Sequence, residues 1–156
     1  MRILGIDPGS RITGYGIIDS PRKYVASGTI RLEALAMPER LTTIYDDLTT
    51  IIQKYEPNCV VIEQVFFYKN AQSALKLGYA RGVAMLAAKK ALCSVFEYTP
   101  RAMKQAVTGH GNASKEDIQT MVQNMLHLSG RPTVDAADAL GLAICHQLHS
   151  NLLLKT

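Results

Sequence analysis

The sequence lacks any apolar run of about 18 residues, so it predicts no membrane-spanning helix. Its first residues form an apolar, strand-like segment rather than a basic and then apolar leader, so no signal peptide is expected. We find no internal repeats, low-complexity segments or linkers. Of the 156 residues, 47% are hydrophobic and 19% are charged, an ordinary globular balance that excludes extensive disorder. This length predicts one domain, residues 1–156, with a full core.

Cysteines are few, and a strong charge of either sign is lacking. Cys59, Cys93 and Cys145 are widely spaced, which excludes a zinc-finger spacing and a disulfide framework and predicts reduced thiols in the cytoplasm. The net charge of +4 and the pI near 9.0 favour a polyanionic partner only weakly. There is no long basic tail.

The most informative segment is the short apolar run that ends on Asp7. Ile3, Leu4 and Ile6 lack helical spacing, and the run is too short for a helix, so it predicts a strand buried on both faces. Pro8 and Gly9 end the strand. Asp7 is therefore expected at the carboxyl end of a central strand, where open α/β sheets bind their ligands, although an aspartate before Pro-Gly can also simply cap a turn.

The rest of the chain predicts an α/β fold. Two further strands are expected over 11–19 and 24–30, the second at a sheet edge, and an amphipathic helix runs from about 38 to 55. Gly14 and Gly16, inside the first of these strands, predict a close backbone approach or a bulge. A second continuous apolar run, 59–63, also ends on an acid, Glu63. Then follow a helix over about 71–91, a strand over 93–98, a short helix near 100, a helix that opens at 114 with a variant of the capping box, and a last helix over about 134–152. This order predicts a five-stranded mixed sheet with helices on both faces.

Four carboxylates stand at comparable positions in these elements. Asp7 and Glu63 each end a strand, and they would meet if the two strands are parallel neighbours. Asp135 and Asp138, three residues apart, share one face of the last helix. Taken alone, this pair is more typical of helix capping. Four converging acids, however, need a cation to remain ionised together, and all-oxygen ligands suit Mg²⁺ or Mn²⁺. Such a site favours metal-assisted phosphoryl transfer.

Several segments resemble those of a known family, the RuvC-type Holliday-junction resolvases of bacteria. The resemblance runs in order from Ile3 to about His146, and it is specific because the segments occur together. They are Gly5-Ile6-Asp7-Pro8-Gly9-Ser10, Ile62-Glu63-Gln64-Val65-Phe66, Ser73-Ala74-Leu75-Lys76-Leu77-Gly78, Ala80-Arg81-Gly82-Val83 and Asp135-Ala136-Ala137-Asp138-Ala139-Leu140.

The resemblance implies a ribonuclease H-like fold and a homodimer. It also implies a metal-dependent endonuclease that makes paired symmetric nicks in four-way junction DNA and leaves 5′-phosphate ends, within a T-rich tetranucleotide. By position, Asp7, Glu63, Asp135 and Asp138 match the family's catalytic acids. Two Mg²⁺ ions per site, replaceable by Mn²⁺, and a partnership with the RuvA–RuvB branch-migration complex are implied as well; no nucleotide cofactor is expected.

Candidate DNA-contacting residues come from the same resemblance and from charge. Phe66 matches an aromatic that contacts unpaired bases, and Lys104 and Lys115 match basic residues near the scissile phosphate, so Lys115 is also a candidate catalytic residue. Further candidates for phosphate contact are Lys69, Lys76, Arg81 and Arg11, although each of these taken alone is more often a solvated surface charge.

Some alternatives stay open at this point. The fold could belong to a sugar-kinase or actin-type phosphate-binding module, to a protein that binds junctions without cutting them, or to a related nuclease acting on RNA precursors. His146 and His149 could in principle bind a metal, but a partly exposed helix face is favoured. The stripe of Leu75, Leu77, Met85 and Leu86 is either packing surface or dimer interface.

Overall fold

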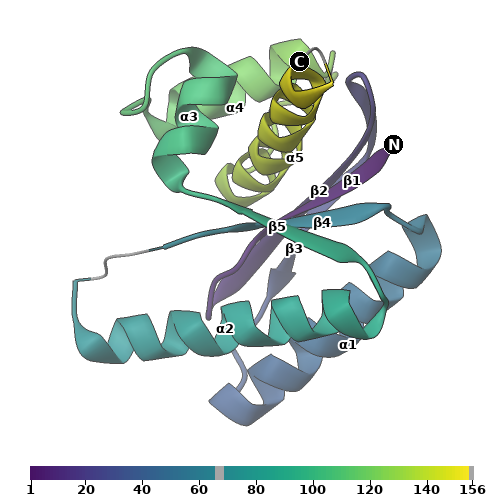
Figure 1. Cartoon of the computed structure of the whole chain (residues 1–156). Helices are drawn as coiled ribbons and strands as arrows, with labels where there is room; N and C mark the ends of the chain where they lie inside the picture. Colours follow the sequence, from purple (N-terminus) through teal and green to yellow (C-terminus); the bar gives the residue numbers. More distant parts are fainter. Residues whose placement is uncertain (66–68, 155–156) are drawn as a thin grey trace.

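The computed structural model describes residues 1–65 and 69–154. Its strands are β1 (Arg2–Asp7), β2 (Ile12–Asp19), β3 (Lys23–Arg31), β4 (Cys59–Glu63) and β5 (Ser94–Tyr98). Its helices are α1 (Met37–Tyr55), α2 (Ala71–Lys90), α3 (Pro100–Thr108), α4 (Lys115–Met125) and α5 (Val134–Leu153). Helices α1 and α2 cover one face of the sheet and α3, α4 and α5 cover the other (Figure 1). Within the described residues no helix is long and apolar enough to cross a membrane.

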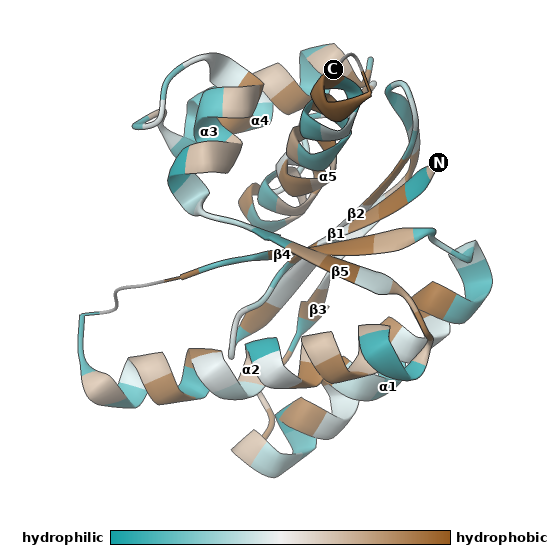
Figure 2. Cartoon of the chain, in the orientation of Figure 1, coloured by the Kyte–Doolittle hydropathy of each residue, from teal (hydrophilic) through white to brown (hydrophobic). Residues whose placement is uncertain are grey.

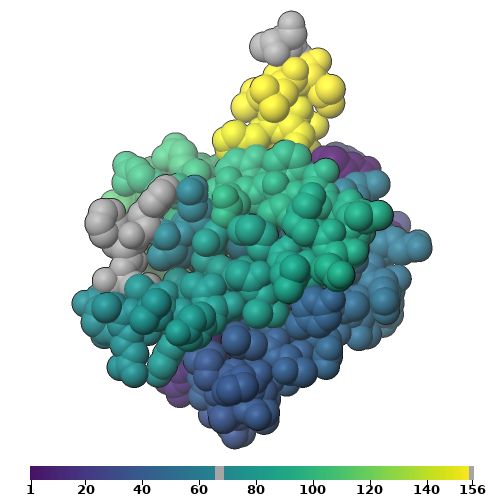
Figure 3. All heavy atoms as spheres, turned by 60° about the horizontal axis from the view of Figure 1, so that its bottom comes forward, coloured from purple at the N-terminus to yellow at the C-terminus, as the bar shows by residue number. Residues whose placement is uncertain are grey.

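The five strands form one sheet in the order β3-β2-β1-β4-β5. β1 pairs antiparallel with β2, and β2 with β3, while β4 runs parallel to both β1 and β5. The predicted five-stranded mixed sheet, the edge position of the third strand and the parallel pairing of the two acid-terminated strands are therefore confirmed. The last turns of α5 project from the body of the molecule (Figure 3).

The core has two halves, one on each face of the sheet. Along β1, Ile3 packs on the side of α3, α4 and α5, whereas Leu4 and Ile6 pack on the side of α1 and α2. Val60 and Val61 of β4 divide in the same way. Figure 2 shows the resulting hydrophobic colour along the central strands. Continuous apolar runs arise because both faces of these strands are buried.

Side-chain caps fix where the helices begin. Ser114 accepts a hydrogen bond from the Asp117 backbone, and Asp117 accepts one from the Ser114 backbone, which confirms the expected capping box at α4. Asn70 and Thr133 cap α2 and α5 in the same manner, each accepting from a backbone amide three residues on. These caps fix the starts of α2, α4 and α5, whereas α1 begins without a side-chain cap.

Helix α5 lies unusually close to the sheet, and glycines in the strands permit this. A Cβ atom on Gly5 of β1 would overlap the carbonyl oxygen of Ala139, and one on Gly14 of β2 would overlap that of Asp135. The close approach expected of glycine in a strand interior is thus confirmed. It places the first turns of α5 directly over the ends of β1 and β2.

Replacing Gly5 with alanine is expected to push α5 away from β1, because the obstructing atom is backbone and cannot rotate aside. We predict a loss of at least about 2 kcal/mol in the free energy of unfolding, measured by urea denaturation. The matched control is Gly78→Ala in α2, where nothing lies within 4 Å of the added Cβ atom. That change should leave the stability unchanged or raise it by up to about 1 kcal/mol. Equal stability of the two variants would contradict the close packing of α5.

Candidate functional site

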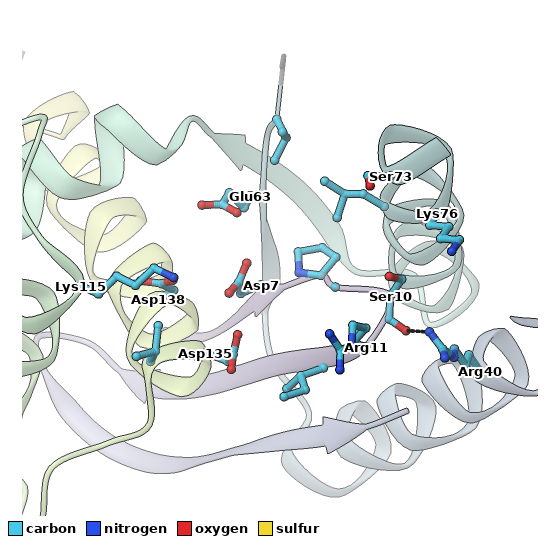
Figure 4. Close-up of a pocket in the computed structure, with 16 residues that line it drawn as sticks. Asp7, Ser10, Arg11, Arg40, Glu63, Ser73, Lys76, Lys115, Asp135 and Asp138 are labelled. Carbon is cyan, nitrogen blue, oxygen red and sulfur yellow. Dashed lines mark hydrogen bonds between the residues drawn. The ribbon is translucent and has the colours of Figure 1, made fainter. Parts of the chain in front are cut away.

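A cavity of about 550 Å³ opens at the carboxyl ends of β1 and β4. All four predicted acids line it, as do Lys115 and Lys76 and two arginines that follow or face the turn after β1, Arg11 and Arg40. Figure 4 shows the four carboxyl groups turned towards a common space, with Lys115 beside Asp138. The structure therefore brings together side chains that are up to 131 positions apart, from Asp7 to Asp138.

The strand pairing positions Asp7 and Glu63. Ile6 of β1 pairs with Ile62 of β4 in parallel register, so the residue that follows each of them leaves the sheet at the same edge. Asp7 and Glu63 lie close enough for a hydrogen bond between their carboxyl groups. The prediction that these two acids meet is confirmed by this register.

The close packing of α5 positions the other two acids. The backbone of Asp135 rests on Gly14, and the carbonyl of Ala139, one residue after Asp138, rests on Gly5. Thr133 caps the helix by accepting a hydrogen bond from the Ala136 amide at 3.3 Å, which fixes its first turn. Two small residues, Ala136 and Ala137, are buried between the acids and let the helix lie flat on the sheet.

Burial and like charge make this cluster difficult to ionise. Burial, followed by the charges of Glu63 and Asp138, raises the pKa of Asp7 well above its usual range. Burial also raises the pKa of Glu63, while the Asp7 hydrogen bond and the charges of Lys104 and Arg81 oppose this rise. Burial and the charges of Glu63 and Asp135 raise the pKa of Asp138 to about 7. Without a cation, the cluster therefore holds protons near neutral pH.

The acids suit a hard divalent cation. Within residues 1–65 and 69–154, no three Asp, Glu, His or Cys side chains stand close enough to enclose one metal ion by themselves. Mg²⁺ does not need such a cage, because it is usually held by one or two carboxylates together with water and phosphate oxygens. A buried, mutually repelling set of carboxylates next to an open cavity fits that mode of binding, with Asp7, Glu63, Asp135 and Asp138 as the available ligands.

The predicted cationic residues differ in how close they lie to the acids. Lys115 and Lys76 line the cavity. Lys104 does not, although its charge lowers the pKa of both Glu63 and Asp138, so it lies near the acids. Lys69 is exposed beside the start of α2. Phe66, the predicted base-contacting aromatic, lies outside the described residues, so its role stays a prediction.

Arg81 is bonded within the protein. Its Nε donates to the backbone oxygen of Glu63 at 2.9 Å, and its guanidinium forms an ion pair with Glu97 of β5. The arginine thus ties α2 to the ends of β4 and β5, directly behind a catalytic candidate. This arrangement does not test the predicted contact of Arg81 with DNA. The arginine side chain is partly exposed, at 21%.

Arg40 is a site residue that sequence reasoning missed. From α1 it donates hydrogen bonds to the backbone oxygens of Ser10, Leu35 and Glu33 at 3.1, 2.7 and 3.3 Å. It therefore holds the turn after Asp7 against the start of α1 (Figure 4). No local pattern signals its contact with the turn, because that partner is the backbone oxygen of Ser10, thirty residues earlier.

The two histidines of α5 do not form a metal site. His146 is buried, not on a partly exposed face as expected, because Phe96 and Tyr98 of β5 cover it. Its Nδ1 is 3.0 Å from the Tyr98 hydroxyl. His149 is exposed, and its Nδ1 is 2.8 Å from the Cys145 carbonyl oxygen. The expectation of exposure was wrong for His146 because the edge strand β5 packs its aromatic residues over the helix.

Comparisons with known proteins agree with this geometry. A family model described as "Crossover junction endodeoxyribonuclease RuvC" matches residues 3–146. A protein of that name from Vibrio cholerae is 55% identical over 147 residues, which cover 92% of this chain and 85% of the relative. One from Hydrogenovibrio crunogenus is 51% identical, covering 97% and 90%. The structure titled "T. thermophilus RuvC in complex with Holliday junction substrate" superposes with a TM-score of 0.89 at 31% identity, covering 97% and 96%.

The raised pKa of Asp138 predicts how stability depends on pH in metal-free protein. The pKa of its carboxyl group is 3.8 in the unfolded chain and about 7 in the folded protein. Between these values the folded state binds the extra proton, so the free energy of unfolding falls as pH rises through this window. Asp138→Asn removes that dependence and should be more stable than the parent above the window, by at most about 4 kcal/mol.

Urea denaturation in EDTA across the pH range measures this effect. The stability difference between Asp138→Asn and the parent should shrink towards zero as pH falls to the lower end of the window. Asp47→Asn, at an exposed carboxylate of α1, is the control and should show no such trend. A difference that is constant with pH would contradict the burial and crowding of Asp138.

Proposed function

The chain belongs to the RuvC family of crossover junction endodeoxyribonucleases, and we propose that its cluster of Asp7, Glu63, Asp135 and Asp138 is the centre at which it cuts DNA. The fold is ribonuclease H-like, and the protein is a nuclease that resolves Holliday junctions in DNA recombination and repair. The whole of residues 1–156 acts as one nuclease domain. Its three free cysteines suit the reducing cytoplasm.

One observation carries the assignment of the centre: four crowded carboxylates line one open cavity, and all-oxygen ligands of this kind suit a hard cation. DNA phosphates and unneutralised carboxylates repel one another, so acids on a DNA-cutting surface need a metal between them and the substrate. The family is one of metal-dependent nucleases. We assign Mg²⁺ as the metal, with Mn²⁺ as a substitute and two ions per site. When bound, the ions supply an activated water and stabilise the leaving oxygen.

The protein's own side chains divide the remaining work. The four acids would hold the metal beside the scissile phosphate group and would give up their protons on binding it. Lys115, beside Asp138, is placed to neutralise the charge that develops on the phosphate, and Lys104 lies behind the same acids. Hydrolysis leaves a 5′-phosphate and a 3′-hydroxyl. Lys76, Lys69 and Arg81, together with Phe66, are proposed to contact the flanking DNA.

A homodimer gives the paired cuts their symmetry. The outer face of α2 carries Leu75, Tyr79 and Leu86, whose side chains are 58%, 47% and 52% exposed. These residues share one face of the helix. Gly78 and Gly82 lie between them, and a Cβ atom added at either glycine would meet nothing within 4 Å. Such a stripe of apolar and small residues suits an isologous interface, in which two copies of α2 pack across a two-fold axis. Two active sites so related match the two-fold symmetry of a four-way junction.

The remaining partner is the RuvA–RuvB branch-migration complex. It is proposed from family membership alone, because the described residues contain nothing that identifies its docking surface. Branch migration would bring preferred cleavage sequences to the two active sites.

Cleavage of a synthetic four-way junction tests the metal centre. With Mg²⁺ the protein should introduce paired nicks, and it should leave matched linear duplex intact. EDTA, or Asp7→Asn, should lower the rate at least about a hundredfold while junction binding survives. Asp47→Asn, on the opposite face of the sheet, should cut like the parent. Unimpaired cutting by Asp7→Asn would refute the assignment, and binding without cutting under any metal would indicate a junction-binding protein.

Leu86→Glu tests the dimer face. A charge in the middle of the stripe should convert the dimer to a monomer in sedimentation equilibrium and replace paired nicks by single, uncoordinated ones. Leu152→Glu is the control, since Leu152 is 65% exposed at the far end of α5 and lies off the stripe. If Leu86→Glu remained dimeric, the interface would have to lie elsewhere.

A further inference from the structure

A second hollow, separate from the acidic cavity, lies beside the edge strand β3. It has a volume of about 690 Å³ and opens between the turn that joins β2 to β3 and the segment 126–132 that joins α4 to α5. Arg22, Lys23 and Tyr24 line it from the turn, and His127 and Arg131 line it from the segment. In Figure 1 this turn rises on the same side of the sheet as α3, α4 and α5.

The hollow is positively charged. Three of its lining residues are Arg or Lys, and the part of the chain that the structure describes contributes no Asp or Glu to its lining. The acid nearest to Lys23 on the hairpin, Asp19, is already paired with Arg2, whose Nε is 2.8 Å from its carboxylate. Glu116 and Asp117 lie beyond Arg131 in the first turn of α4, where Asp117 is occupied as a cap. Asp19 also interacts with Lys23, but neither Arg22 nor Lys23 forms an ion pair within the described residues, so the hollow keeps a net positive charge.

Hydrogen bonds hold one wall of the hollow in place. Arg131 donates to the backbone oxygen of Glu116 at 3.1 Å and to the Gln119 side chain at 3.3 Å. Gln119 in turn donates to the Pro132 oxygen at 2.9 Å. Arg131 is thus fixed next to the turn of α4 that carries Lys115, and Lys115 lines the acidic cavity. Arg131 at the hollow and Lys115 at the acidic cavity are therefore two cations at the same turn of α4.

One arm of DNA can span the two sites. Asp135 rests on Gly14, and Lys23, which lines the hollow, pairs with Asp19, five residues further along β2. Five residues of strand span about 17 Å. A duplex presents a phosphate on each strand about every 3.4 Å of its axis. DNA whose scissile phosphate occupies the acidic cavity would therefore place phosphates of the adjoining arm within reach of the hollow.

From this arrangement we propose that the β2–β3 turn and segment 126–132 form a second subsite that binds the backbone phosphates of a junction arm. The inference rests on the proposed function, because the acidic cavity sets where the DNA lies. The subsite carries no sequence information. It orients the arm, so that the phosphate at the acids is presented in the correct register.

The variant Arg22→Gln/Lys23→Gln tests this subsite, because within the described residues neither side chain forms a hydrogen bond or ion pair that the substitution would break. Lys54→Gln/Lys90→Gln is the control: it removes the same two charges from α1 and α2, on the opposite face of the sheet. Junction binding is measured in EDTA, where cutting does not interfere, as a function of salt. Ethylation of individual DNA phosphates then maps the contacts.

We expect the turn variant to bind several-fold more weakly at low salt and to lower the slope of log K against log salt by about two. Ethylation of a few arm phosphates should weaken binding by the parent and by the control, but no longer by the turn variant.

Other outcomes would overturn the subsite. Equal slopes and footprints for the parent and the turn variant would show that the hollow does not meet DNA and leave it free for an acidic protein. Equal losses of junction-binding affinity in the two double variants would show an effect of net charge alone. Cutting by the parent keeps these failures distinct from failure of the proposed function, which would appear as a parent protein that neither binds nor cuts junctions.

Discussion

The repulsion among the four partly buried carboxylates is the interaction on which the rest of the structure depends. Asp7 is held between Glu63, Asp135 and Asp138, and burial together with their charges raises its pKa. Bringing these groups together does not favour stability, since a buried charge is unfavourable without a partner. A bound metal ion would relieve this repulsion. Lys104 and Lys115 reduce the repulsion from outside the cluster but do not remove it.

The rest of the molecule holds this cluster in a fixed geometry. The parallel register of β1 and β4 aligns Asp7 with Glu63, and the glycine contacts of α5 bring Asp135 and Asp138 to the same edge. Arg40 fixes the turn after Asp7 through backbone oxygens. Because Arg81 bonds to the Glu63 backbone from α2, the proposed dimer helix and the catalytic strand are mechanically linked. The proposed cutting centre and the proposed dimer face thus belong to one connected framework.

Much of this framework could be predicted from the sequence, because its signals are local. Two apolar runs that end on acids predicted β1 and β4, and Gly14 predicted a close approach. Contacts set by tertiary packing could not be predicted. Arg40 binds backbone atoms of a distant turn, and the burial of His146 depends on β5 aromatics that pack across it. The basic hollow joins residues about a hundred positions apart, Arg22 and Arg131, whose charges look like ordinary surface charges in sequence.

Metal binding by the folded protein, measured together with its protons, tests the central claim most directly. Mg²⁺ would be titrated calorimetrically into the protein near pH 7, in buffers that differ in ionisation enthalpy. We predict that binding releases protons, because the raised pKa values of Asp7 and Asp138 leave the cluster partly protonated until the cation arrives. Asp7→Asn should abolish most of the binding. Mg²⁺ binding without proton release, or equal binding by Asp7→Asn, would show that the four acids are not the metal centre.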